Sequence, residues 1–472
     1  MDVLREEWLR YFLEKEEIQL TDDQEKALGT FLDFLRSYDD RSTLLLTGSA
    51  GTGKTFLINI FSRHLRKLGY KVILLAPTGR AAKVITQRSN RLAYTIHHHI
   101  YSPLQNGYDV VFSRKENKKK SKTVYIVDEA SMIGDDAGGG GNNLLRDLLH
   151  YVFDGDPARR LIMVGDPVQL PPVGLDRSPG LDATALHAVD DLDLWEAHLK
   201  EVKRQVVDSG ILEHAVAIRD AYFSETGESL HLESNRDVQV IDQPWEALET
   251  YLGYFEEGNP DRAVFITYSN YQATRINQAI RAQMWETEEK LVRGDLLMVV
   301  RNNYAWGDQK RFPFIANGEM GTVREVYPES LETRYGLEWM DVELEFIDAR
   351  GEPILVNCKV VLSLLTEKHA QLPSETRYAI LQARRTEYAG LSMSQATLLM
   401  RSDPYVQGLE VKYGYAITGH KSQGGQWENV LINFEPDYGQ NLPAYIRWTY
   451  TVFTRATERV FLLNCPFAPR DF

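Results

Sequence analysis

Eight residues constrain the fold of this chain more than any others. They read Gly-Ser-Ala-Gly-Thr-Gly-Lys-Thr, which fits the pattern G-x-x-x-x-G-K-[ST], and the apolar run Leu44 to Leu46 precedes them. Glycines in such a loop let backbone N–H groups converge on a phosphate at the start of a helix. The sequence therefore predicts an α/β domain that binds a nucleotide. The loop residues are Gly48, Ser49, Ala50, Gly51, Thr52, Gly53, Lys54 and Thr55.

Charged and hydroxyl side chains at two places suit nucleotide chemistry. Lys54 can neutralise the outer phosphates, and the Thr55 hydroxyl can hold Mg²⁺. The apolar run 124–127 ends in Asp128 and Glu129. Asp128 suits the Mg²⁺ shell, and Glu129 suits polarising an attacking water. An acidic pair after a strand is also common as a helix cap, so this pair gains its meaning from the phosphate loop upstream.

Apolar runs of strand length alternate with helical patterns in two parts of the chain. The runs are 44–46, 72–75, 124–127, 161–164, 264–267, 430–432 and 461–463, and the clearest helical patterns are 54–68 and 79–88. Buried strands that alternate with helices indicate parallel sheets covered on both faces. The predicted fold class is therefore α/β. Thr21 and the apolar spacing after it predict a capped helix before the first strand.

The stretch from 287 to 400 has a different texture. Short strand-like runs are split by Gly, Asn and Pro, which is typical of a small β-barrel. We therefore expect a first α/β domain over residues 1–198, a second over 199–286 and 401–472, and a barrel inserted at 287–400.

The overall composition sets looser limits. The formal net charge of −14 argues by itself against nucleic-acid binding, because phosphate contacts need Lys and Arg. A groove can nevertheless be basic while the outer surface is acidic. Only two cysteines are present, and the many charges in residues 1–20 do not fit a signal peptide. With no apolar run long enough to span a bilayer, we expect a cytoplasmic protein without membrane contact.

Several further motifs follow one another in a definite order. Asp128-Glu-Ala-Ser131 and Gly165-Asp-Pro-Val-Gln-Leu-Pro-Pro-Val173 resemble superfamily 1 helicases, most closely the 5′-to-3′ class that includes the RecD-like and phage Dda helicases. The resemblance runs from Gln24 to about Leu463. The other matching segments are 20–24, 76–83, 95–97, 201–205, 317–321, 415–424 and 450–456. The chain departs from the family pattern at Gly419 and Gly425.

The resemblance implies two RecA-like domains, a small β-hairpin in the first, and an SH3-like β-barrel in the second. ATP would bind with Mg²⁺ between the two motor domains. Gln24 would read adenine, and Gln169 would touch the γ-phosphate. Arg204 and Arg455 would act as arginine fingers, because cations lower the barrier where charge spreads over the γ-phosphate oxygens. Gln423 and Gly424 would also contact the nucleotide.

The resemblance also implies contacts with single-stranded nucleic acid. The implied contact residues are Pro77, Thr78, Lys83, His97, Thr418, His420 and Lys421. The segment 101–122 occupies the place of the pin that splits a duplex, with Phe112 as the aromatic tip and Tyr108 second. Its lysine run, 115–122, is either a solvated loop or a set of phosphate contacts. Consecutive histidines at 97–99 do not share one face, so we do not expect a metal site there.

These observations predict an ATP-dependent DNA helicase. It would move 5′-to-3′ on single-stranded DNA, unwind duplex at forks, act as a monomer and serve DNA repair or recombination. The alternatives are an RNA helicase and a nucleotide-gated nucleic-acid-binding module that does not hydrolyse ATP. An additional nuclease activity would need a cluster of metal-binding carboxylates outside the ATP site, and the sequence contains none.

Overall fold

The structure is a computed structural model that describes residues 13–14, 18–106, 109–119, 122–134, 143–202, 209–224, 230–256, 259–307, 314–348, 350–435 and 442–468. The chain divides into two compact units. Unit 1 comprises Met1–Pro77, Arg88–Ser102 and Phe112–Leu212, and unit 2 comprises Thr78–Gln87, Pro103–Val111 and Glu213–Phe472.

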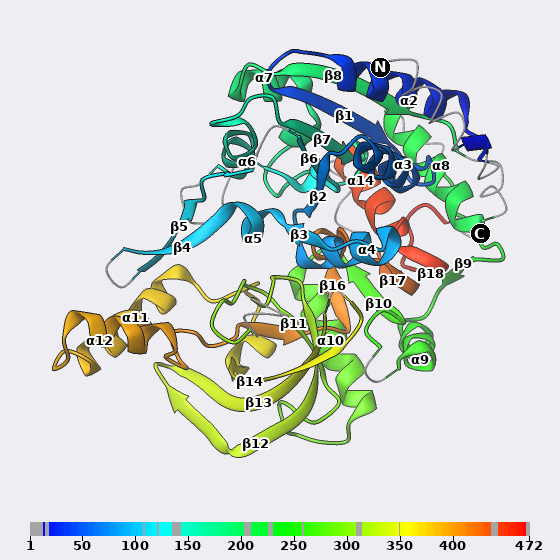
Figure 1. Cartoon of the computed structure of the whole chain (residues 1–472). Coiled ribbons are helices and arrows are strands. Elements are labelled where there is room, and N and C mark those ends of the chain that lie inside the picture. The colour runs from blue at the N-terminus through cyan, green and yellow to red at the C-terminus, as the bar shows by residue number, and fades with distance from the viewer. Residues whose placement is uncertain are drawn as a thin grey trace. The chain divides into compact units, whose positions relative to one another are not determined.

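Unit 1 is built on a six-stranded parallel sheet in the order β3-β2-β6-β7-β1-β8 (Figure 1). Every residue of β1, β6 and β7 is buried. Strands buried on both faces explain why the sequence shows continuous apolar runs here rather than alternation. The strands are β1 (Ser42–Gly48), β2 (Lys71–Ala76), β3 (Ala93–Thr95), β6 (Thr123–Val127), β7 (Arg160–Gly165) and β8 (Asp193–Leu199).

The connections of unit 1 are mostly helical. The helices are α2 (Asp22–Arg36), α3 (Lys54–Lys67), α5 (Ile96–Ile100), α6 (Leu144–Phe153), α7 (Ala183–Val189) and the short 3₁₀ turns η1 (Ala130–Met132) and η2 (Pro179–Leu181). Thr21 caps α2 as predicted. Its hydroxyl accepts from the backbone N–H of Gln24, and the Gln24 side-chain oxygen accepts from the backbone N–H of Thr21. Strands β4 (Tyr101–Asn106) and β5 (Asp109–Arg114) form a separate two-stranded sheet, of which Pro103–Val111 are grouped with unit 2 and the remaining residues with unit 1.

Unit 2 contains a second parallel sheet, with five strands in the order β16-β10-β17-β18-β9. Its strands are β9 (Val238–Ile241), β10 (Ala263–Thr267), β16 (Ala416–Thr418), β17 (Trp427–Asn433) and β18 (Ala456–Leu463). Its helices are α4 (Gly79–Ser89, grouped here up to Gln87), α8 (Gly210–Ser224, from Glu213), α9 (Pro244–Tyr254), α10 (Asn270–Met284), α13 (Gly419–Ser422) and α14 (Leu442–Phe453). The prediction of two parallel-sheet α/β domains is confirmed.

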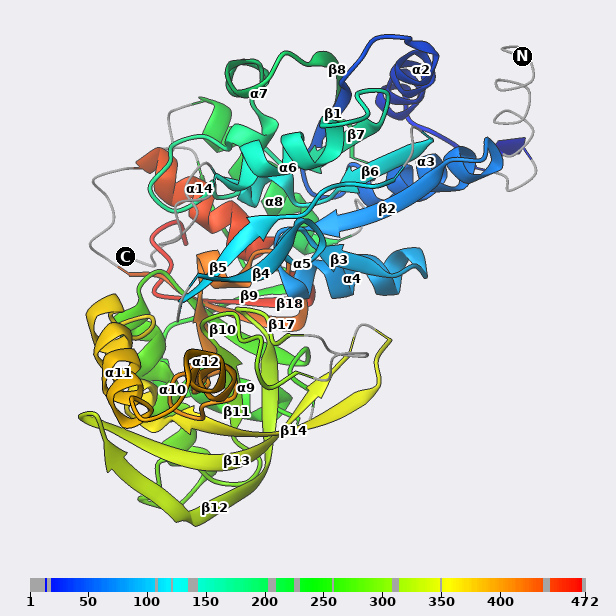
Figure 2. The same ribbon diagram turned by 60° about the vertical axis from the view of Figure 1, so that its left-hand side comes forward.

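An antiparallel sheet in unit 2 occupies most of the stretch that the sequence marked as different. Its order is β14-β13-β12-β11-β15, and Figure 2 shows β12 and β13 as long, curved strands. The strands are β11 (Leu296–Val299), β12 (Met320–Arg334), β13 (Leu337–Ile347), β14 (Pro353–Val361) and β15 (Val411–Tyr413). Helical segments that the sequence analysis did not predict follow β14, namely η4 (Leu362–Leu365), α11 (Ser374–Glu387) and α12 (Met393–Arg401).

Among the described residues, none of the helices combines the length and the apolar character that crossing a bilayer would demand.

Candidate functional site

The carboxyl ends of three buried strands in unit 1 meet at one edge of the sheet. The register pairs Thr47 of β1 with Gly165 of β7, and Val127 of β6 with Met163 of β7. The residues that follow these strands therefore lie side by side. They are the phosphate loop, the pair Asp128 and Glu129, and Asp166. In open α/β sheets this edge is the usual ligand site.

The phosphate loop turns sharply around its own lysine. Gly51 and Gly53 have φ angles of 78° and 92°, in the left-handed region that glycine adopts without strain. The Lys54 ammonium donates to the carbonyls of Gly48 and Ser49 at 2.6 and 3.0 Å. Gly53 is the N-cap of α3 and offers no side chain to the first amide N–H groups of the helix. Those N–H groups and Lys54 form a positive site suited to phosphate.

Asp166 is a counter-ion of Lys54 that the site prediction did not include. Its carboxylate lies 3.8 Å from the Lys54 ammonium and is fully buried. It also accepts from the Val168 N–H at 3.0 Å. The sequence did carry a signal, because Asp166 comes one residue after a buried strand, as Asp128 does after β6.

Gln24 contacts the phosphate loop directly. Its side-chain N–H donates to the carbonyl of Thr52 at 2.9 Å, and the side chain is 1% exposed. A Cβ at Gly53 would collide with the Gln24 amide nitrogen. The adenine-reading role that the family resemblance implies stays a prediction, and in this structure the amide is already engaged by protein.

Asp128 and Glu129 are close enough to repel each other. Burial, and next the Glu129 charge, raise the pKa of the Asp128 carboxyl to about 6. One Asp128 oxygen accepts from the Glu129 N–H at 2.9 Å, and Glu129 has a φ of 53°. A divalent cation beside these carboxylates would offset their repulsion. The donor set of Asp128 and the Thr55 hydroxyl is the oxygen chemistry that Mg²⁺ prefers, so these residues fit the ion.

Gln169 lies in the segment that follows β7, as Asp166 does. Its backbone N–H donates to the Asp166 carbonyl at 3.2 Å, and its side chain is 5% exposed. The side-chain oxygen is buried and has no hydrogen-bond partner among the described residues. A buried amide oxygen without a partner is costly, and a bound ligand or water could satisfy it.

Arg455, in unit 2, lies at the end of α14 and is 4% exposed. Its guanidinium donates to the Thr451 carbonyl at 2.9 Å, to the Thr454 hydroxyl at 3.1 Å and to the Gly425 carbonyl at 3.4 Å. The Arg455 carbonyl accepts from the Trp427 N–H at 3.0 Å. Arg455 thus holds the loop that contains Gln423 and Gly424.

The two glycines that depart from the family pattern both face tryptophans of unit 2. A Cβ at Gly419 would collide with the Trp448 ring nitrogen, and a Cβ at Gly425 would lie 2.6 Å from the Trp427 ring. Trp427 and Trp448 are each 1% exposed. Large buried side chains therefore take the space that an apolar residue at 419 would need.

The predicted nucleic-acid residues of unit 2 lie on α4 and α13 or directly before these helices. The Thr78 hydroxyl accepts from the Ala81 N–H at 3.2 Å. Burial raises the pKa of the Glu319 carboxyl, and the charge of Lys83 partly offsets this by lowering it. On α13, Lys421 donates to the side-chain oxygen of Asn317. Burial lowers its pKa to about 8.

The remaining predicted residues are placed less completely. Thr418 is buried at the start of α13, and burial lowers the pKa of His420 and of His97. Pro77 ends the first segment of unit 1. Arg204 lies outside the described residues, as does the side chain of Phe112. Within the described ranges, no cluster of three or more His, Cys, Asp or Glu residues could hold a metal ion.

Two protein families match this chain. Residues 19–241 match the AAA domain family, which covers the phosphate loop, the acidic pair and Gln169. Residues 413–463 match the UvrD-like helicase C-terminal domain, which covers α13 and Arg455. The matches therefore fall on both parallel sheets. They include the predicted nucleotide-site residues of unit 1 and the predicted residues on α13 and at Arg455 in unit 2.

Three relatives cover different shares of the chain. The ATP-dependent RecD2 DNA helicase of Deinococcus radiodurans is 32% identical over 35% of this chain and 21% of its own length. The ATP-dependent DNA helicase dda of Enterobacteria phage T4 is 24% identical over 59% of this chain and 61% of its own length. The ATP-dependent DNA helicase Pif1 of Bdellovibrio bacteriovorus is 27% identical over 88% of this chain and 82% of its own length.

The chain thus spans less than two thirds of the RecD2 and Dda proteins. The family matches nevertheless coincide with motifs in both units, in the order that the sequence resemblance requires. The family matches and the relatives together support the resemblance of this chain to superfamily 1 helicases related to the RecD-like and Dda proteins.

Proposed function

We propose that this protein is an ATP-driven motor that moves along single-stranded DNA and unwinds duplex. One observation carries the proposal: the phosphate loop, Asp128, Glu129 and the Lys54–Asp166 pair occupy the same edge of a parallel sheet. This arrangement would supply a phosphate site, a cation site and a polarising carboxylate within one unit. A binding module would need the first alone.

The chemistry assigned to unit 1 is phosphoryl transfer to water. Lys54 would release the loop carbonyls of Gly48 and Ser49 to neutralise the outer phosphates. Thr55 and Asp128 would hold Mg²⁺, which when bound neutralises charge on the phosphate oxygens. Glu129 would orient and polarise the attacking water. Gln169 would respond to the γ-phosphate through its side-chain N–H donors, while its side-chain oxygen, which has no partner among the described residues, would accept from a water.

Two arginines would complete the catalytic set. Arg204 and Arg455 would place positive charge near the γ-phosphate, with Gln423 and Gly424 contributing to nucleotide binding. The proposal for Arg455 rests on the family motif. Its present hydrogen bonds to Thr451, Thr454 and Gly425 are to neutral acceptors, so a phosphate would compete with them effectively.

The nucleic-acid contacts would come from residues that grip a backbone without reading bases. Lys83, His97 and Lys421 supply charge or polar contact, and Pro77, Thr78, Thr418 and His420 complete the set. The two-stranded sheet β4-β5 would serve as the pin. Phe112, which the sequence analysis placed at the aromatic tip, lies within β5 and not at the turn between the two strands, so it would contact the base pair from the side of the pin. The antiparallel sheet would form the SH3-like insertion at 287–400. We further propose 5′-to-3′ movement, action on forks as a monomer, and a role in DNA repair or recombination in the cytoplasm.

ATP turnover with and without single-stranded oligonucleotide tests this proposal. We expect low basal turnover and strong stimulation by single-stranded DNA, because strand binding would help to align the catalytic groups. Equal stimulation by an RNA oligonucleotide of the same sequence would favour the RNA alternative. Nucleotide binding without turnover under any condition would favour the nucleotide-gated binding module.

A further inference from the structure

Both strands of the β4-β5 sheet are tied to the core of unit 1 at the end of the sheet that lies near α5 and α6 (Figure 1). At the start of β4, the Tyr101 hydroxyl donates to the Asp147 carboxylate on α6 at 2.6 Å. Tyr101 is 5% exposed, and burial together with this hydrogen bond raises the pKa of its hydroxyl. A charge-assisted hydrogen bond in a buried setting holds its partners in one geometry.

Lys115 ties the end of β5 to α5. Its ammonium donates to the carbonyls of His98 and His99 at 2.8 and 3.3 Å, and its backbone N–H donates to the Ile100 carbonyl at 2.7 Å. These carbonyls belong to the last turn of α5. A cation here satisfies carbonyls that the helix leaves without partners. Lys115 therefore joins the end of β5 to the helix that carries His97.

The segment after Lys115 is held as firmly. The guanidinium of Arg159, 3% exposed, donates to four backbone carbonyls, which are those of Asn117, Lys119, Val152 and Asp154. The Asn117 side chain donates to the Tyr125 hydroxyl at 2.8 Å and to the Tyr151 carbonyl at 2.9 Å. Asn117 and the backbone of Lys119 are thus fixed to the core of unit 1.

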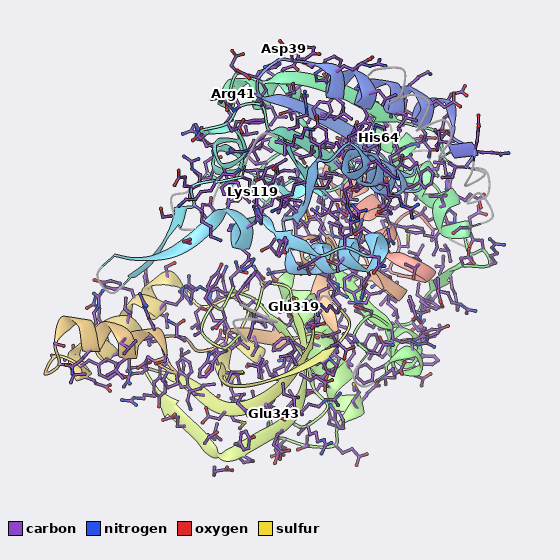
Figure 3. All side chains as sticks on the ribbon, in the orientation of Figure 1. Asp39, Arg41, His64, Lys119, Glu319 and Glu343 are labelled. Atoms are coloured by element: carbon purple, nitrogen blue, oxygen red, sulfur yellow. The ribbon has the colours of Figure 1, made fainter. Side chains whose placement is uncertain are left out.

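Lys119, labelled in Figure 3, has a defined partner as well. Its ammonium lies 3.1 Å from the His99 ring nitrogen. Burial, and next the Lys119 charge, lower the pKa of His99 to about 3, so the neutral ring accepts this hydrogen bond. Lys118 differs from its neighbours, since its side chain is 83% exposed and its carboxylate neighbour Glu116 is 3.9 Å away.

We propose that Tyr101 and Lys115 are positioning residues for strand separation, because they fix the base of the β4-β5 sheet to α6 and to the strand-gripping helix α5. The inference rests on the proposed helicase function and on the pin role of β4-β5. A pin separates base pairs only if it resists the load when the motor pulls a strand against it. Two anchors on different helices resist rotation of the sheet, which one anchor would allow.

Tyr101→Phe and Lys115→Met test the proposal. The first removes one hydroxyl from a packed ring, and the second removes the ammonium while keeping most of the side-chain length. Lys118→Met is the matched control. It removes the same charge from a solvent-exposed side chain that lies three residues from Lys115 in the sequence. Thermal denaturation reports folding. DNA-stimulated ATP turnover, the KM for ATP and unwinding of a 5′-tailed duplex are measured in parallel.

We expect each of the two variants to open fewer base pairs per ATP, by roughly fivefold, which is the effect of one lost hydrogen bond. Turnover and the KM for ATP should match those of Lys118→Met, which should unwind like the parent protein. The melting temperature should fall by no more than about 2–4 °C, the effect of one lost hydrogen bond. Lys115→Arg, which keeps donors for the α5 carbonyls, should restore much of the unwinding.

Unchanged unwinding in Tyr101→Phe and Lys115→Met would overturn the positioning role, and so would a fall in turnover equal to the fall in unwinding. If Lys115→Met lowers the melting temperature by more than this, Tyr101→Phe alone decides, since it leaves every charge in place. Failure of the parent protein to unwind or to respond to DNA would instead contradict the proposed function itself.

Discussion

The side-chain amide of Gln24 donates to the carbonyl of Thr52 across 2.9 Å, linking the start of α2 to the middle of the phosphate loop. The other end of the same amide accepts from the Thr21 N–H at 3.2 Å. Thr52 in turn donates its hydroxyl to the Ser49 carbonyl at 2.8 Å. Gln24 therefore supports the shape of the loop, and reading a base would require it to release these partners.

Gln24→Ala should lower kcat/KM for ATP and for GTP by the same factor, because the loop that both triphosphates share loses its support. The loss of one or two buried hydrogen bonds predicts a fall on the order of five- to thirtyfold. Steady-state kinetics with both nucleotides give the answer. If the variant loses preference for ATP over GTP, Gln24 reads adenine, as the family resemblance implies.

Lys54→Ala and Glu129→Gln should stop ATP hydrolysis by different routes. Lys54→Ala removes the charge that binds phosphate, so a fluorescent ATP analogue should bind poorly. Glu129→Gln should bind the analogue normally and lose roughly 10²–10⁴-fold in turnover, the range for general acid–base groups. Glu116→Gln, at a side chain 82% exposed, is the control for a lost carboxylate. Near-normal turnover in Glu129→Gln would remove that residue from the mechanism.

DNA affinity should depend on pH through Lys421. Because burial lowers its pKa to about 8, the side chain is mostly charged below that pH and mostly neutral above it. Affinity for single-stranded DNA, measured at constant salt, should therefore weaken as the pH rises from about 7 to about 9. Lys421→Arg, which stays charged, should flatten the profile. A parent protein whose affinity is constant over this range would exclude Lys421 as a phosphate contact.

Gly419→Val should destabilise the protein by about 1–3 kcal/mol, the usual cost of overpacking, because the new side chain would collide with Trp448. Gly253→Ala is the control: it adds a Cβ inside α9, where nothing lies within 4 Å, and should leave stability equal or slightly higher. Urea unfolding measures both. An unchanged midpoint for Gly419→Val would show that Trp448 yields easily and that the glycine has another cause.

The elements that the sequence predicted well are those determined by local patterns. The Thr21 cap, the phosphate loop and the buried strands of both parallel sheets depend on neighbouring residues, and the structure confirms them. The helices α11 and α12 were missed because they interrupt a region of strand-like runs, and their exposed faces carry apolar side chains such as Tyr378 and Leu398. Such exposure weakens the helical pattern.

The contacts that were not predicted join residues far apart in sequence. Gln24 is 28 positions from Thr52, and Arg159 is 40 positions from the Lys119 carbonyl that it binds. No local pattern encodes such a pair. The lysine segment shows the consequence, because composition alone predicted solvent or phosphate around Lys115, whereas the structure gives it helix carbonyls.

Unwinding of partial duplexes with a single tail tests the central claim most directly. The substrates carry a 5′ tail or a 3′ tail, each made in DNA and in RNA, and are incubated with the protein, ATP and Mg²⁺. We predict unwinding of the 5′-tailed DNA duplex, with little on the 3′-tailed DNA or on either RNA. Absence of ATP-dependent unwinding on every substrate, with nucleotide binding intact, would contradict the account.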